Sequence, residues 1–121
     1  MPRKRNEDDI QMACVKWFRL RFPEPKGLIF SVPNGGSRNK AEAGKLKSTG
    51  VRAGIPDLVV VLPENIFFIE MKFGKGTQGP NQKIIEKILK RLGFNYYIAR
   101  TFDEFENIVN YEYKKAFSQI K

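Results

Sequence analysis

The chain has 121 residues, which suffices for one ordinary domain with a single core and is too short for two. Hydrophobic residues make up 41% of it, and no apolar run approaches the roughly 20 residues of a membrane helix, so we expect a folded protein of the cytoplasm. Lys and Arg outnumber Asp and Glu by 22 to 13, and the resulting net charge of +9 favours a polyanionic partner such as nucleic acid.

Two residue types restrict the chemistry. The chain contains no histidine, which excludes Ser-His-Asp triads, histidine-bound zinc and nucleases that use a histidine general base. The single cysteine, Cys14, forms neither an internal disulfide nor a cysteine metal site, and we interpret it as a small core residue in a reducing compartment. Any catalysis must therefore use carboxylates, lysines and a bound hard cation.

The N-terminal part predicts a helix and a short strand. Residues 1–5 are a basic tail that we expect to be disordered, and Asn6 is a candidate cap for a helix with an acidic first turn. This helix has one apolar face as far as about Phe22: Ile10, Ala13, Cys14, Trp17 and Phe18. Pro23 ends the helix, and residues 28–32 are a predicted strand.

The middle of the chain carries the clearest strands. Residues 33–38 are a predicted loop, and residues 39–48 are helical in composition with only a thin apolar face. Residues 57–62 and 66–72 are rich in β-branched and aromatic side chains, which predicts two strands joined by a hairpin loop at residues 63–65.

The C-terminal part predicts two helices with a strand between them. Pro80 suits the first turn of one helix, residues 94–99 form the strand, and the last helix reaches about Phe117. The first of these helices has a stripe that we expect to be buried: Ile85, Ile88, Leu89 and Leu92. The order α-β-(α)-β-β-α-β-α predicts a single α/β domain over residues 1–121, with a mixed central β-sheet flanked by helices.

Three polar side chains meet at one end of the predicted hairpin. A three-residue hairpin loop places Asp57 opposite Met71, between Glu70 and Lys72. Glu70 and Lys72 are two positions apart and therefore project from the same face of their strand. Because an unpaired carboxylate on an apolar strand costs several kcal/mol, Glu70 requires a partner such as a lysine or a cation.

Two carboxylates and a lysine in this arrangement are sufficient for phosphodiester hydrolysis without histidine. Mg²⁺ takes oxygen ligands and normally keeps several waters beside one or two carboxylates. Such a cation polarises a phosphoryl oxygen and lowers the pKa of a bound water, and a neighbouring lysine stabilises charge that builds on the phosphate. The alternative for the three residues alone is a solvated Glu70–Lys72 pair on a hairpin, with Asp57 capping the strand start.

Several strings of the sequence together resemble a known family. GIPDLVVV is followed by FIEMK, with Glu70 thirteen positions after Asp57 (70 − 57 = 13), and then by GPNQK. An early helix with Glu7 and Gln11, a Pro-Asn-Gly-Gly-Ser-Arg loop and a helix-borne Gln82 extend the pattern over most of the chain. The chain thereby resembles the PD-(D/E)xK nuclease superfamily and, within it, the virus-type replication-repair nuclease family, VRR-NUC.

The resemblance implies a restriction-endonuclease-like core with a Mg²⁺ or Mn²⁺ site. The cation ligands would be Asp57, Glu70 and the backbone carbonyl of Met71, and Lys72 would be the catalytic lysine. Gln82 would lie near the metal as a further catalytic residue, in reach of Lys72 or of a metal-bound water. An ordinary exposed polar residue is the alternative for Gln82.

The glutamate that the family carries on its first helix falls on Glu7, which would be a further catalytic and metal-binding residue. Asp8 and Asp9 adjoin it, so one of them could occupy the position instead. We prefer Glu7 because it precedes Ile10 by three residues and Cys14 by seven, on the inward face of the helix. The alternative is that all three acids only stabilise the helix N-terminus electrostatically.

A basic, glycine-bearing stretch precedes the Asp57 strand, and a second short one follows Lys72. We expect these stretches to contact the DNA backbone through Asn34, Arg38, Lys40, Lys45, Lys47, Arg52 and Lys75. The alternative is an ordinary solvated loop and helix. The glycine spacing around Lys75 does not match a nucleotide-binding loop, so no nucleotide cofactor is expected.

The resemblance implies a hydrolase, namely a Mg²⁺- or Mn²⁺-dependent DNA endonuclease acting in DNA repair or replication. Small members of the family are similar to structure-selective enzymes of the Holliday-junction resolvase type, so we expect a branched DNA partner and no membrane. A junction requires two cuts and the chain has one site, which predicts a homodimer. A virus-encoded protein of this kind would act in the host cytoplasm.

Two alternatives remain for the function. One is a nicking, flap-cutting or broad DNase that a partner protein directs. The other is a non-catalytic DNA-binding module that retains the fold. The intact set of Asp57, Glu70 and Lys72 argues against the second, because a binder has no need of all three.

Overall fold

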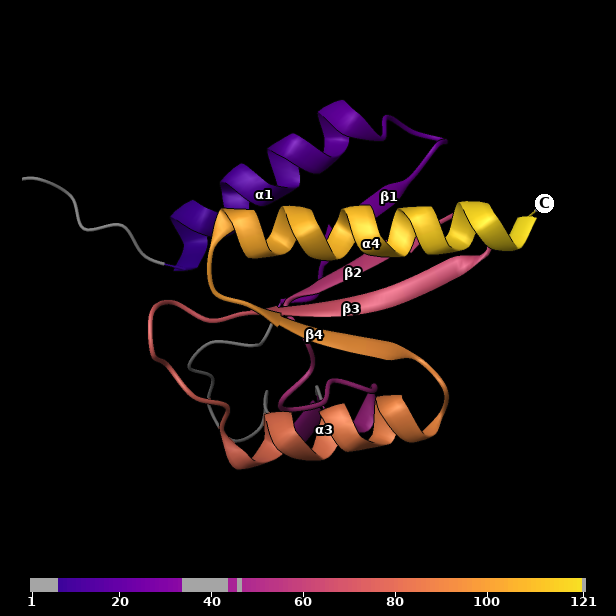
Figure 1. Cartoon of the computed structure of the whole chain (residues 1–121). Coiled ribbons are helices and arrows are strands. Elements are labelled where there is room, and N and C mark those ends of the chain that lie inside the picture. Colours follow the sequence, from indigo (N-terminus) through magenta and orange to yellow (C-terminus); the bar gives the residue numbers. More distant parts are fainter. Residues whose placement is uncertain (1–6, 34–43, 46, 121) are drawn as a thin grey trace, which may run out of the picture.

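A computed structural model describes residues 7–33, 44, 45 and 47–120 of the chain. Its helices and strands follow the predicted order (Figure 1). They are α1 (Glu7–Arg21), β1 (Leu28–Ser31), β2 (Leu58–Leu62), β3 (Asn65–Met71), α3 (Pro80–Arg91), β4 (Asn95–Ala99) and α4 (Phe102–Ile120). The basic tail, the Asn6 cap and most of the predicted 39–48 segment lie outside the described residues, although residues 44, 45, 47 and 48 are helical.

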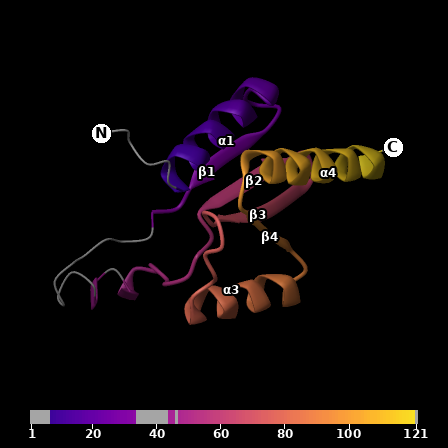
Figure 2. The same ribbon diagram turned by 60° about the vertical axis from the view of Figure 1, so that its left-hand side comes forward.

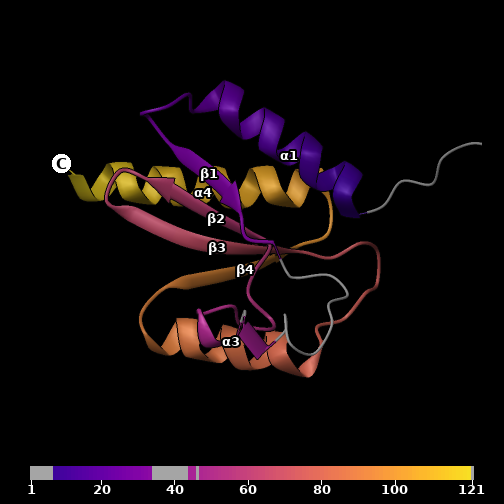
Figure 3. The same ribbon diagram turned by 180° about the vertical axis from the view of Figure 1, so that it is seen from behind.

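The four strands form one mixed sheet in the order β1-β2-β3-β4. The β1–β2 and β2–β3 pairs are antiparallel, and the β3–β4 pair is parallel because α3 carries the chain back across the sheet. Helices α1 and α4 cover one face of the sheet and α3 lies on the other (Figures 1 and 2). The view from behind in Figure 3 has the same three layers. The predicted mixed α/β domain is confirmed.

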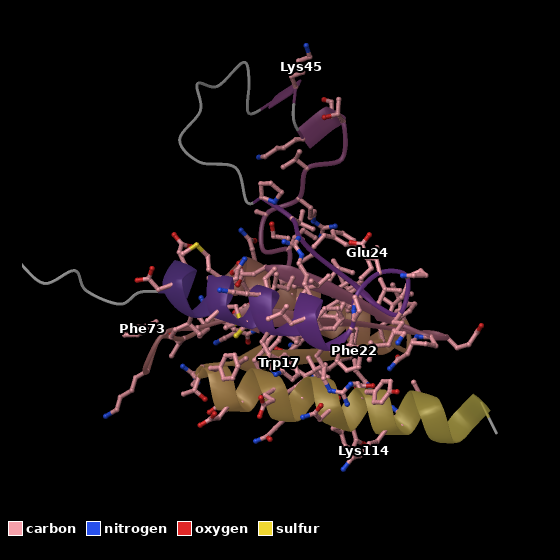
Figure 4. The ribbon with its side chains drawn as sticks, turned by 90° about the horizontal axis from the view of Figure 1, so that it is seen from above. Trp17, Phe22, Glu24, Lys45, Phe73 and Lys114 are labelled. Carbon is pink, nitrogen blue, oxygen red and sulfur yellow. The ribbon has the colours of Figure 1, made fainter. Side chains whose placement is uncertain are left out.

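The core lies between the sheet and the layer of α1 and α4. Alternate residues of β2 are buried there, and they pack with Phe18 of α1 and Phe105 of α4. Trp17 stands edge-on to both Phe22 and Phe105, with ring centroids 6.3 Å and 6.1 Å away, and lies between the two helices (Figure 4). Cys14 is fully buried in this layer, and burial raises the pKa of its thiol to about 12. Its predicted role as a core residue is confirmed.

The β2–β3 hairpin is one residue tighter than predicted. Leu62 pairs with Asn65, so the turn contains only Pro63 and Glu64, and Glu64 adopts a φ of 57°. A two-residue turn of this kind has proline at its first position and a residue with positive φ, normally glycine or asparagine, at its second. Glutamate at the second position therefore does not predict such a turn. The predicted register is therefore wrong by one residue: Asp57 lies opposite Glu70, not Met71.

The predicted buried stripe of α3 is only partly correct. Ile85 is buried and Leu89 is half-buried, but Ile88 and Leu92 are 39% and 66% exposed. Helix α3 packs mainly on β4, an edge strand of the sheet, and this contact is narrower than the apolar face of the helix.

Within the described ranges, no helix has both the length and the apolar character needed to cross a membrane.

Candidate active site

The site lies where β2 begins and β3 ends. Asp57 directly precedes β2 and Glu70 is the penultimate residue of β3, so the antiparallel pairing brings them to the same end of the hairpin. The Asp57 carboxylate oxygen Oδ2 accepts a 2.7 Å hydrogen bond from the backbone N–H of Met71. This contact ties the Asp57 side chain to the backbone of Met71, the residue that directly follows Glu70 on β3.

Alternation along the strands decides which face carries the site. Phe67, Ile69 and Met71 belong to the core under α1 and α4. Glu70 therefore projects to the opposite face, where α3 lies, and Asp57 projects to that face as the residue opposite it.

The loop before Asp57 is held against the start of α3. Gly54 has a φ of 87°, and a Cβ atom built on it would lie 2.5 Å from the backbone carbonyl of Asn81. Only glycine permits both this backbone conformation and this approach. The buried Pro56 follows, and the backbone carbonyl of Asp57 accepts a 3.2 Å hydrogen bond from the N–H of Val32 after β1. Asp57 is thus held by Val32 after β1 and by Met71 of β3, and the loop that leads to it lies against the start of α3.

The two oxygens of Glu70 have different surroundings. The side chain is fully buried, and Oε1 accepts a hydrogen bond from the hydroxyl of Tyr96. Oε2 is buried without a hydrogen-bond partner among the described residues, and the ammonium of Lys72 lies 3.8 Å from it. Burial raises the pKa of the Glu70 carboxyl, although the Tyr96 hydrogen bond and the Lys72 charge act in the opposite direction.

Lys72 continues the strand beyond Glu70. Its backbone N–H donates a 3.0 Å hydrogen bond to the carbonyl of Ala99, which extends the pairing with β4. Its side chain is largely buried, at 16% exposure. A separation of 3.8 Å from Glu70 Oε2 is too long for a hydrogen bond, so the attraction is purely electrostatic. The structure therefore brings Asp57, Glu70 and Lys72 together, as the sequence predicted.

Two residues of the site were not predicted from the sequence. Tyr96 of β4 donates to Glu70, and its hydroxyl accepts a 3.2 Å hydrogen bond from the Gln78 side-chain amide. Burial, followed by the neighbouring Glu70, raises the pKa of the Tyr96 hydroxyl, so it remains protonated at neutral pH. Tyr96 faces Glu70 because β3 and β4 are parallel and pair Phe68 with Tyr96, two positions before Glu70 on the same face.

Arg100 organises the loop after Lys72 and was also missed. Its guanidinium donates to the carbonyls of Gly74 and Gly76, at 2.8 and 2.6 Å. Arg100 follows β4 as Lys72 follows β3, and parallel neighbours end at the same edge of a sheet. The contact of Arg100 with the loop after Lys72 could have been predicted from the sequence only if the parallel pairing of β3 with β4 had been known.

The predicted companions of the site stand as follows. Gln82 lies in the first turn of α3, and its side-chain oxygen accepts a 2.8 Å hydrogen bond from the N–H of Gly79, which stabilises the helix N-terminus. Its role near a metal stays a prediction. Glu7 is the first residue of α1, but its side chain lies outside the described residues. Asp8 is exposed and Asp9 is half-buried, so the choice among the three acids stays open.

The predicted DNA-binding residues lie on exposed segments where they are described. Lys45, Lys47, Arg52 and Lys75 are all exposed. Figure 4 places Lys45 on a segment that projects from the body of the domain. Asn34, Arg38 and Lys40 lie outside the described residues.

The donor set fits a hard divalent cation. Oxygen donors from Asp57, Glu70 and the Met71 backbone are those that Mg²⁺ and Mn²⁺ prefer. Glu70 Oε2, which has no hydrogen-bond partner among the described residues, is an oxygen that a cation would satisfy. Among the residues described, no group of three or more His, Cys, Asp or Glu side chains is arranged to hold a metal ion. A metal here would therefore depend on two carboxylates, backbone and water, with Glu7 as the further candidate.

Comparisons with known proteins identify the family and the fold of the chain. The sequence profile of the VRR-NUC domain family matches residues 5–103. A solved structure described as a VRR_NUC domain protein superimposes with a TM-score of 0.70 at 23% identity, covering 95% of this chain and 93% of that one. A second, described as a VRR_NUC domain, has a TM-score of 0.57 at 24% identity and covers 82% and 92% of the two chains.

No sequence among the curated proteins matches the chain significantly. The family profile nevertheless spans the site from the first helix to the start of α4 and includes every residue that the geometry brings together. The chain belongs to the VRR-NUC domain family and has the nuclease-type fold of that family.

Proposed function

We propose that this protein is a Mg²⁺- or Mn²⁺-dependent DNA endonuclease that hydrolyses phosphodiester bonds at the site of Asp57, Glu70 and Lys72. The observation that carries the proposal is the fully buried Glu70, whose Oε2 has no hydrogen-bond partner among the described residues and lies 3.8 Å from the ammonium of the largely buried Lys72. A structural carboxylate at this depth would be expected to have both oxygens satisfied. An unsatisfied one suits a site that acquires a ligand.

Each residue of the site has a role that its surroundings support. Asp57, Glu70 and the Met71 carbonyl would hold the cation, which when bound polarises a phosphoryl oxygen and lowers the pKa of a water. Asp57 is oriented by the Met71 N–H, so its carboxylate does not depend on solvent for its position. Lys72 supplies a positive charge that stabilises the negative charge developing on the phosphate in the transition state.

DNA as the substrate is supported by charge. The net charge is +9, and exposed lysines and an arginine precede the Asp57 strand and follow Lys72. We propose that Lys45, Lys47, Arg52 and Lys75 contact phosphates, together with Asn34, Arg38 and Lys40. Contacts of this kind position a duplex without reading its sequence.

We further propose that the protein cuts branched DNA as a homodimer, in the manner of a Holliday-junction resolvase. The support is that one chain carries one site, whereas a junction requires two cuts in opposed strands. Light scattering on and off a four-way junction tests this proposal, with two protomers per junction as the expected result. One protomer per junction, with cutting of flaps or nicking of duplexes, would favour the partner-directed DNase instead.

The catalytic proposal is tested by cleavage of labelled four-way junctions, flaps and linear duplexes in Mg²⁺ or Mn²⁺, with a chelator as the blank. Glu70→Gln and Lys72→Ala should each reduce the cleavage rate by at least about a hundredfold, since each removes a group that acts on the reacting phosphate. Glu64→Gln and Lys87→Ala are matched controls on exposed residues outside the site, and both should cut normally. Binding of DNA without cutting in any divalent cation would indicate a non-catalytic module.

A further inference from the structure

We propose that Tyr96, supported by Gln78, is a positioning residue that restricts Glu70 to a single metal-binding oxygen and thereby makes the site select small six-coordinate cations over Ca²⁺. This inference rests on the proposed function, because it concerns how the same site chooses its cation. Neither residue lies in the strings GIPDLVVV, FIEMK and GPNQK, although both lie within the residues that the family profile matches.

Tyr96 is placed to hold one particular oxygen. It is 5% exposed on β4, and its ring projects from the same face as Glu70 of the neighbouring parallel strand. Its hydroxyl donates to Glu70 Oε1 and accepts from the Gln78 amide at 3.2 Å. Because a hydroxyl has a single proton and that proton goes to Oε1, the Gln78 contact fixes the direction of the donation.

The hydrogen bond from Tyr96 makes the two oxygens of Glu70 unequal. Oε1 is occupied by a neutral donor, while Oε2 is buried without a hydrogen-bond partner among the residues that the structure describes. The carboxylate cannot rotate to exchange the two oxygens without breaking the Tyr96 bond inside a buried site. Glu70 is therefore prepared to offer one oxygen to a cation, and that oxygen is Oε2.

A single-oxygen carboxylate favours one class of cation. Mg²⁺ requires near-octahedral geometry at about 2.0–2.1 Å and is commonly held by one oxygen of each carboxylate with waters completing the shell. Ca²⁺ takes 6–8 oxygens at about 2.3–2.6 Å and often uses both oxygens of a carboxylate. Two-oxygen binding by Glu70 would make Oε1 share its charge between the cation and the Tyr96 hydrogen bond, which weakens both contacts. This cost falls on Ca²⁺ and not on Mg²⁺ or Mn²⁺, which need only Oε2.

The test is the ratio of Ca²⁺ to Mn²⁺ dissociation constants, measured by calorimetry on the full chain without DNA. Tyr96→Phe keeps the ring and removes the hydroxyl. It should weaken Mn²⁺ binding because Glu70 is no longer oriented, and it should spare or strengthen Ca²⁺ binding. The expected change in the ratio toward Ca²⁺ is about tenfold, the scale of one hydrogen bond to a charged group.

Tyr97→Phe is the matched control, because it makes the same substitution at the next residue. The Tyr97 hydroxyl donates to Glu112 on the α4 face of the sheet, so its loss should leave the ratio unchanged. Gln78→Met is a second variant in the half-buried loop, and it should move the ratio in the same direction as Tyr96→Phe by a smaller factor. It keeps the test decisive if Tyr96→Phe does not fold.

The outcomes separate this inference from the proposed function. If the unmodified protein binds neither cation, or if Glu70→Gln binds Mn²⁺ as well as the unmodified protein does, the metal site itself is wrong and both proposals fail. If Glu70→Gln abolishes Mn²⁺ binding but Tyr96→Phe and Gln78→Met keep the unmodified ratio, the site stands and the selectivity role of Tyr96 is refuted.

Discussion

Two glutamates are buried on opposite faces of the sheet, and their surroundings shift their pKa values in opposite directions. Glu112 of α4 is fully buried, and its carboxylate accepts hydrogen bonds from Tyr97 and from the amides of Asn65 and Asn95, at 3.0 and 2.7 Å. Glu70 is equally buried but has one oxygen without a hydrogen-bond partner in the described part of the chain. The first glutamate is satisfied as a structural group, whereas the second is held in a state that costs stability.

Replacing the charge of Glu70 should stabilise the metal-free protein. Because burial raises the pKa of Glu70 in the folded state, the ionised carboxylate destabilises the fold above that pKa, and this cost disappears below the ordinary glutamate pKa. Glu70→Gln should therefore unfold at a higher urea concentration at pH 7 in a chelating buffer, with the gain lost near pH 4. Glu64→Gln, at an exposed turn, is the control. A less stable Glu70→Gln at pH 7 would contradict the buried charge.

Removing Glu112 should have the opposite effect. Burial opposes its ionisation, but the bonds from Tyr97, Asn65 and Asn95 prevail and lower its pKa. Its contribution is therefore present in full above about pH 5 and is lost as the pH falls through the lowered folded-state pKa. Glu112→Ala should reduce the free energy of unfolding by about 3 kcal/mol at pH 7 and by less at pH 3. Glu106→Ala on the same helix is the control, and equal losses in the two variants would refute the network.

At the scale of elements, the contact between the Gly54 loop and α3 aligns the site. A Cβ at Gly54 would collide with the Asn81 backbone, whereas at Gly50, which also has a positive φ of 108°, nothing lies within 4 Å. Gly54→Ala should therefore lower the free energy of unfolding by at least about 3 kcal/mol, against about 1 kcal/mol for Gly50→Ala, in which only backbone strain acts. Thermal denaturation measures both, and similar losses would contradict the close approach.

The elements that could be predicted from the sequence are those with local signals. Runs of β-branched and aromatic residues identified β2 and β3, and with them the convergence of Asp57, Glu70 and Lys72. The register was missed by one residue because Glu64 adopts a positive φ that its side chain does not favour. Asn65, expected in the loop, instead begins β3 and donates to Glu112 at 3.0 Å across a separation of 47 residues, which no local pattern encodes.

The partners of the site on β4 could not be predicted for a related reason. The parallel pairing of β3 with β4 is set by the crossover through α3, and no hairpin turn fixes its register. Tyr96 therefore gave the sequence pattern of an ordinary strand residue, and Arg100 that of an ordinary surface charge. The exposure of Ile88 and Leu92 has the same origin, since how much of α3 the sheet covers depends on packing and not on helical periodicity.

For the whole molecule, the distribution of charge should determine how DNA binds. Lys45 and the outward-facing Lys114 of α4 lie on opposite sides of the domain (Figure 4). Lys75→Ala and Lys45→Ala should each weaken DNA binding and reduce the slope of log Kd against log salt by about 1, as expected for one lost phosphate contact. Lys114→Ala should leave the slope unchanged. Equal effects from all three variants would indicate binding by net charge alone.

Whether Glu70 holds a catalytic metal is decided by the single-turnover rate of DNA cleavage in saturating Mn²⁺, measured for the unmodified protein and for Glu70→Gln at equal occupancy of the DNA. The site described above predicts metal-dependent cleavage by the unmodified protein and a rate at least about a hundredfold lower for Glu70→Gln. Equal rates in the two proteins, or cleavage that persists when a chelator removes the metal, would contradict it.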